Sequence, residues 1–116
     1  MKLEGERTLL RIFIGDSDRH QGVALYDAIV QRARQQGLAG ATVLRGVEGF
    51  GAASRIHKAS ILRLSEDLPM VIEIVDEEAK IEAFLPLLET MVGDGLVTLE
   101  RVRVVLYRAE REGARA

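Results

Sequence analysis

Residues 70–95 decide the fold, and they read MVIEIVDEEAKIEAFLPLLETMVGDG. Their first six residues alternate between two faces, which is the pattern of a β-strand. Asp76 is predicted to cap the following helix. Apolar residues then recur at helical spacing, at Ile81, Phe84, Leu85, Leu88 and Met91. The segment 93–95, Gly-Asp-Gly, ends the helix, and we expect a final strand over 96–107.

The N-terminal half repeats this order of elements. We expect a strand over 8–14, whose Leu10, Ile12 and Ile14 share one face. A turn over 15–18 leads to a helix over 23–36, which Gly37 should terminate. A second strand follows over 41–47. The two halves are joined by a long excursion, in which 58–64 resembles a short strand.

The order β-α-β-excursion-β-α-β predicts an α+β, ferredoxin-like βαββαβ fold. It consists of a four-stranded antiparallel sheet with two helices on one face and an extended loop between strands 2 and 3. We expect residues 1–116 to form a single domain, with an ordered core over about 8–107 and a frayed tail over 108–116.

Composition excludes several classes of function. The chain has 116 residues, a net charge of −2, 4% aromatic residues and no cysteine. This charge argues against non-specific binding to nucleic acid, and the low aromatic content argues against base stacking on the sheet. No disulfide or thiolate chemistry is possible. The first residues carry acids and no apolar stretch, so we expect no signal peptide and a cytoplasmic location.

The two helices can cover only one face of the sheet. If Val102, Val104 and Leu106 point toward the helices, the other face holds apolar and charged residues in about equal number. They are Leu9, Phe13, Val71, Val75 and Val105 among Arg11, Glu73, Arg101 and Arg103. This mixture is either scattered surface apolarity or a subunit interface, in which the arginines pair with Glu73. The second interpretation predicts an oligomer.

No catalytic or metal-binding constellation stands out. His20 and His57 are the only histidines, and no acid has a spacing that completes a triad with Ser54 and His57. The paired carboxylates, Asp16 with Asp18 and Glu77 with Glu78, stand at predicted helix starts, where capping and the helix dipole account for them. We therefore expect neither an enzyme nor a metal site.

Two glycine-rich segments are candidates for ligand binding. From Gly46 the chain follows the pattern G-x-x-G-x-G, which matches neither the P-loop nor the dinucleotide fingerprint. Four basic residues flank this segment, as an anion or phosphate site would require: Arg45, Arg55, His57 and Lys58. The glycines could equally serve only as turns, and Phe50 either anchors the loop or contacts a ligand. The Gly93-Asp94-Gly95 segment has the same two interpretations.

Several stretches resemble a known family. LPMVIEIV at 68–75 resembles the strand after the T-loop of PII nitrogen-signalling proteins, and GDG at 93–95 resembles their B-loop. RGVEGFG at 45–51, with His57 after it, and LSEDLP at 64–69 are similar to the PII-like family catalogued as domain of unknown function 190. The resemblance covers about Thr8 to Tyr107.

This resemblance implies a homotrimer with ligand sites in clefts between subunits. An adenine nucleotide such as ATP, ADP or AMP would lie between the T-loop base and a neighbour's B-loop. Leu96 stands where the PII B-loop has a phosphate-contacting lysine, so the resemblance does not imply that the ligand is ATP. The residues that the resemblance and the glycine pattern assign to the site are Arg45, Gly46, Gly49, Phe50, Gly51, His57, Lys58, Thr90, Gly93, Asp94, Gly95 and Arg108.

The sequence thus predicts a PII-like regulatory protein. It would bind a small anionic effector and present the 48–67 excursion to a partner. Some relatives occur beside or fused to fluoride-export channel proteins, which suggests a membrane transport protein as that partner. The alternatives are a CutA-like structural or metal-binding trimer and, less favoured, a small enzyme.

Overall fold

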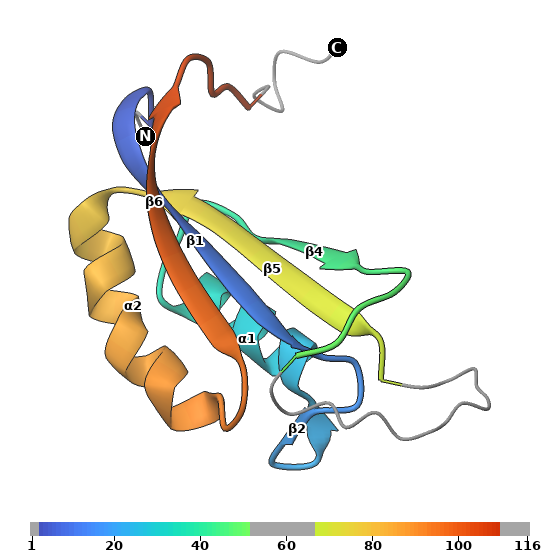
Figure 1. The fold of residues 1–116 in the computed structure, drawn as a ribbon. Helices are drawn as coiled ribbons and strands as arrows, with labels where there is room; N and C mark the ends of the chain where they lie inside the picture. The colour runs from blue at the N-terminus through green and yellow to red at the C-terminus, as the bar shows by residue number, and fades with distance from the viewer. Residues whose placement is uncertain (1–2, 52–66, 110–116) are drawn as a thin grey trace, which may run out of the picture.

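The computed structural model describes residues 3–51 and 67–109. The elements are β1 (Gly5–Gly15), β2 (Arg19–His20), β3 (Val23–Ala24), α1 (Leu25–Gln35), β4 (Thr42–Arg45), β5 (Pro69–Asp76), α2 (Glu78–Met91) and β6 (Leu96–Val104). Four strands form one antiparallel sheet in the order β4-β5-β1-β6, and β2 pairs with β3 in a separate small hairpin. The ferredoxin-like α+β fold is confirmed (Figure 1).

The core lies between the sheet and the two helices. Leu10 and Ile12 of β1 pair with Ile74 and Ile72 of β5, and all four side chains are buried. From the helices they meet Leu25, Ile29 and Ala33 of α1 and Ile81, Phe84, Leu88 and Met91 of α2. The predicted apolar stripes of both helices are therefore correct, and burying these side chains is the main favourable term in folding.

Helix α1 ends as the sequence predicts. Gly37 has a φ of 78°, a left-handed conformation that glycine adopts without steric cost. The N–H of Leu38 donates to the carbonyl of Ala33, and the N–H of Gly37 donates to that of Arg34. These two bonds form a Schellman motif, which satisfies carbonyls at the helix end. Leu38 then packs against the core.

Both predicted helix starts are wrong. The β2–β3 hairpin lies between the 15–18 turn and α1, whose N-cap is Ala24 rather than a polar residue. The N-cap of α2 is Glu77, without a side-chain bond. Asp76 instead ends β5, fully buried, and its two oxygens accept bonds from the N–H groups of Ala39 and Glu77. This carboxylate joins the loop after α1 to the start of α2.

The predicted face assignment of the last strand is also wrong. Leu99 pairs with Leu10 and Val97 with Ile12, so these residues lie on the helix side. Val102 and Val104 therefore lie on the other face, while Arg101 and Arg103 lie on the helix side. The strand ends at Val104 rather than at 107. Apolar residues occur at both parities in this segment, so its pattern alone does not specify a face.

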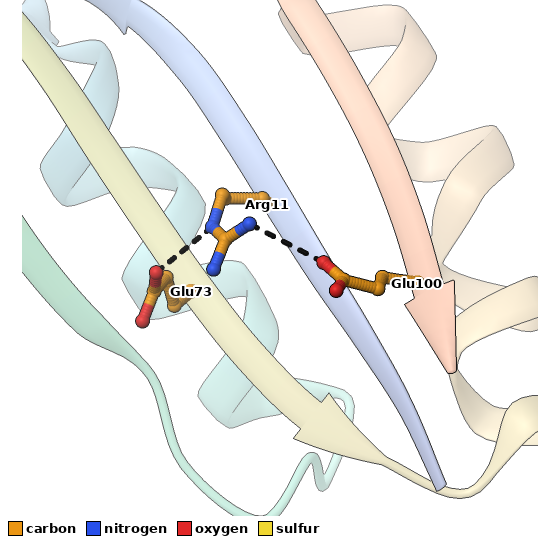
Figure 2. Close-up of polar contacts among 3 residues, drawn as sticks. All are labelled: Arg11, Glu73 and Glu100. Carbon is orange, nitrogen blue, oxygen red and sulfur yellow. Dashed lines mark hydrogen bonds and ion pairs between the residues drawn. The ribbon is translucent and has the colours of Figure 1, made fainter. Parts of the chain in front are cut away.

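On the open face, Arg11 lies between two glutamates (Figure 2). Its Nε donates to Glu73 of β5 at 2.9 Å, and its Nη1 donates to Glu100 of β6 at 3.4 Å. The predicted pairing of Arg11 with Glu73 is present. The third member of this ion-pair group is Glu100. The register of β6 places Glu100 on the open face and Arg101 and Arg103 on the helix side.

Candidate functional site

A cavity of about 390 Å³ lies at one end of the sheet, where three segments meet. One wall comes from the end of β1 and the start of β5, and a second from residues 49–51 after β4. The third is formed by Asp94, Gly95 and Leu96, in the turn between α2 and β6. The lining is Phe13, Ile14, Gly15, Asp18, Gly49, Phe50, Gly51, Asp67, Pro69, Asp94, Gly95 and Leu96. Figure 1 shows this end of the sheet at the bottom of the view, beside β2.

The first wall is held by a set of bonds around Asp67, which we call the Asp67 clasp (the 15–18 turn, Arg45–Gly46 and 67–69). One Asp67 oxygen accepts from both the N–H and the hydroxyl of Ser17, each at 2.8 Å. The N–H of Asp16 donates to the carbonyl of Leu68 at 2.8 Å, and that of Gly46 donates to the carbonyl of Pro69 at 2.7 Å. The clasp thus ties the turn after β1 to residues on both sides of the 52–66 segment.

Two glycines are required for the close approach inside the clasp. A Cβ added at Gly15 would lie 2.6 Å from both carboxylate oxygens of Asp67. A Cβ added at Gly46 would lie 2.7 Å from Cγ of Pro69. Both distances are far below van der Waals contact, so a larger residue would displace its neighbour. This gives the RG at 45–46 and the DLP at 67–69 a structural role.

Arg45 is engaged within the clasp. Its Nη1 donates to Oδ2 of Asp16 in an ion pair, and about half of its side chain is exposed. Its charge is already compensated by the carboxylate, so it would contact an anion only after exchanging partners.

The described lining is acidic and apolar. It contains three aspartates, Asp18, Asp67 and Asp94, and within residues 3–51 and 67–109 no lysine, arginine or histidine belongs to it. Asp18 accepts a bond from the N–H of Gly15 at 3.0 Å. Asp18 and Asp67 are not among the site residues predicted from the sequence, because helix capping accounts for the former and the LSEDLP motif gives the latter no role of its own.

The structure brings together five of the residues named from the sequence: Gly49, Phe50, Gly51, Asp94 and Gly95 all line the cavity. Phe50 is 84% exposed, so it is not anchored in the core. Gly95 approaches β1 closely, because a Cβ there would lie 2.8 Å from the carbonyl oxygen of Phe13.

Arg45 and Gly46 belong to the Asp67 clasp, whereas Thr90, Gly93 and Arg108 do not line the cavity. Thr90 donates its hydroxyl to the carbonyl of Leu87 in its own helix. Gly93 is absent from the lining, and Arg108 follows the far end of β6. His57 and Lys58 lie outside the described residues, as do Ser54 and the expected short strand at 58–64.

A metal site was expected only under the CutA-like alternative. Among the described residues, no group of three His, Cys, Asp or Glu side chains could hold a metal ion. His57, which that alternative would test, is outside these residues. No helix in the described part of the chain is long and apolar enough to cross a membrane.

Solved structures of other proteins share this fold. A protein described as PII-like signaling, from Thermus thermophilus, superposes with a TM-score of 0.63 at 19% identity, covering 90% of this chain and 94% of that one. CPII, a nitrogen regulatory PII-like protein of Thiomonas intermedia, was solved with ADP, AMP and bicarbonate. It gives a TM-score of 0.57 at 20% identity, covering 89% and 91%. The chain has the fold of PII-like proteins.

The family follows from sequence. Residues 7–104 match the family model DUF190, described as "Uncharacterized ACR", and the chain belongs to this family. A UPF0166 protein of Aquifex aeolicus is 41% identical over 102 residues, which are 86% of this chain and 94% of that protein. Another of Methanocaldococcus jannaschii is 34% identical over 103 residues, covering 88% and 93%. The family resemblance noted in the sequence is confirmed.

Proposed function

We propose that this protein is a PII-like regulatory protein, not an enzyme, and that the cavity is its effector site. The observation that carries the proposal is the meeting of residues 49–51 with residues 94–96 around one cavity. In the PII resemblance these segments correspond to the T-loop base and the B-loop. That resemblance takes the B-loop from a neighbouring subunit, whereas here both segments belong to one chain. Ligands of small-molecule size bind in concave, mostly apolar sites of about 300–1,000 Å³, and this cavity falls in that range.

The proposed effector is an adenine nucleotide. Phe13, Phe50 and Leu96 supply apolar surface for a base, and the backbone of the glycine segments can approach a ligand closely. The CPII structures that share this fold were solved with ADP and AMP, which supports the same ligand class here.

We further propose that the protein is a homotrimer whose subunits meet on the open face of the sheet. Phe13 and Leu96 pair with each other on that face, and both line the cavity. The cavity is therefore continuous with the open face. A neighbouring subunit packed there would close the cavity, so the effector would lie in a cleft between subunits.

The signal would be read from the excursion over 48–67. The Asp67 clasp holds residues on both sides of its central segment and also forms one wall of the cavity. An effector that changes the clasp would change what the excursion presents to a partner protein. A membrane transport or fluoride-export protein is the partner we propose, following the family resemblance.

A thermal-shift panel tests the effector. Adenine nucleotides at millimolar concentration should raise the Tm by about 3 °C or more, because a ligand that binds only the folded state stabilises it. Leu96→Glu should abolish the shift, since Leu96 lines the cavity. Leu106→Glu is the matched control: both leucines are more than half exposed, at 56% and 61%, and Leu106 does not line the cavity. No shift with any adenine nucleotide would contradict the proposal.

A further inference from the structure

The charge of the described lining disfavours a ligand that carries several phosphates. The described lining contributes three carboxylates, and Arg45, the nearest cation of the clasp, is paired with Asp16. A triphosphate placed in this cavity would bring like charges together at short range. The described wall instead offers hydrogen-bond acceptors beside apolar surface.

Those acceptors have free capacity for a ligand. Both Asp67 bonds to Ser17 use the same oxygen, Oδ1, and Asp18 uses Oδ2 for Gly15. Asp94 makes no hydrogen bond or ion pair with any other described residue. Ionised carboxylates only accept hydrogen bonds, so the matching ligand groups are amines and hydroxyls.

We infer that the cavity selects a nucleoside or a nucleoside monophosphate over di- and triphosphates, by accepting hydrogen bonds from the ligand's amine or hydroxyl groups. The ring would lie against Phe13, Phe50 and Leu96. This inference rests on the proposed function, because it specifies the form of adenine compound that the same site binds. Asp94 is the specificity-determining residue that is easiest to test, since its carboxylate supports no other described part of the structure.

Calorimetric titration tests the inference. The ligands are adenosine, AMP, ADP and ATP, and EDTA is present so that no divalent cation masks the phosphates. We expect AMP or adenosine to bind at least about tenfold more tightly than ATP, and high salt to narrow this ratio because it screens the repulsion. Asp94→Asn should lower the ratio of AMP affinity to ATP affinity by several-fold. Asp27→Asn, the same change at an exposed residue of α1 outside the cavity, should leave it unchanged.

Three results would decide against the inference. If ATP binds as tightly as AMP to the wild-type protein, the selectivity is absent while the proposed effector site stands. If Asp94→Asn and Asp27→Asn change the ratio equally, Asp94 has no part in specificity. If no adenine compound binds, the proposed function fails and the inference falls with it.

Discussion

Asp67 joins two parts of the chain that are 50 residues apart. Its carboxylate binds the turn after β1, and the absence of a side chain at Gly15 leaves room for it. A hydrogen bond to a charged group contributes about 1.5–3 kcal/mol in favourable cases and less where solvent competes, as it does at this exposed residue. Single residues therefore hold the wall of the candidate site in place, and substitutions at Asp67 and Gly15 test this directly.

Gly15→Ala and Asp67→Ala should not be additive. Each should lower the free energy of unfolding by about 1 kcal/mol, because each removes the two hydrogen bonds that Ser17 donates to Asp67. Once Asp67 is alanine, the added Cβ at Gly15 has no carboxylate to displace, so Gly15→Ala should cost little more. Urea denaturation of the double-mutant cycle measures this. Simple additivity would show that the two residues do not act through one contact.

Gly95→Ala should destabilise the protein by about 1–3 kcal/mol, since its Cβ would collide with the backbone carbonyl of Phe13. Backbone cannot rotate away as a flexible side chain can. Gly40→Ala is the control, because a Cβ there meets nothing within 4 Å. Equal effects of the two changes on the urea midpoint would refute the close approach at Gly95.

At the scale of elements, the sequence predicts best where one face of an element is buried. The core residues of β1, β5 and both helices follow from their periodicity, because burial enforces it. The β6 segment is apolar at both parities, so its face depends on pairing with β1, which the sequence does not display. The β2–β3 hairpin has strands of two residues each, too short for any period to appear.

The same limit applies to the candidate site. Glycine clusters at 46–51 and 93–95 are visible in the sequence, and the expected topology brings them to one end of the sheet. The acidic character of the cavity was not visible, because Asp18 and Asp67 come from segments that meet only in the folded chain. Helix capping and the helix dipole explain an aspartate at position 18 on local grounds, so the sequence does not single out Asp18 as a cavity residue.

The hairpin offers a prediction at this scale. Its two turn residues, Gln21 and Gly22, have φ values of 51° and 84°. A turn with two positive φ values favours Asn-Gly over Gln-Gly. Gln21→Asn should therefore raise the free energy of unfolding by about 0.5 kcal/mol, since asparagine adopts this conformation more readily. A decrease in the urea midpoint would contradict the turn geometry.

At the scale of the whole molecule, the open face decides the assembly. Leu44 and Val71 pair on this face beside Phe13, and Leu44 is 49% exposed. The ion pairs of Arg11 with Glu73 and Glu100 satisfy the charges at its centre without a partner (Figure 2). An apolar surface with internally paired charges suits contact between subunits.

Sedimentation equilibrium should give about three times the chain mass of 12.8 kDa. Val71→Glu should shift the protein toward monomer, because it places an unpaired charge in the proposed interface. Val23→Glu, at a 49% exposed position of the hairpin, should leave the assembly intact. A wild-type monomer, or a Val71→Glu trimer, would refute the proposed interface.

The central claim is that the cavity between residues 49–51 and 94–96 is the effector site. NMR titration of the labelled protein with AMP tests it most directly. We predict that amide shifts concentrate at Gly15–Asp18, Gly49–Gly51 and Asp94–Leu96, the three walls of the cavity. A second cavity is lined by residues of β1, α2 and β6, among them Glu78, Glu82 and Arg101, and shares no residue with the first. Saturable shifts that concentrate there, or the absence of any shift, would contradict the claim.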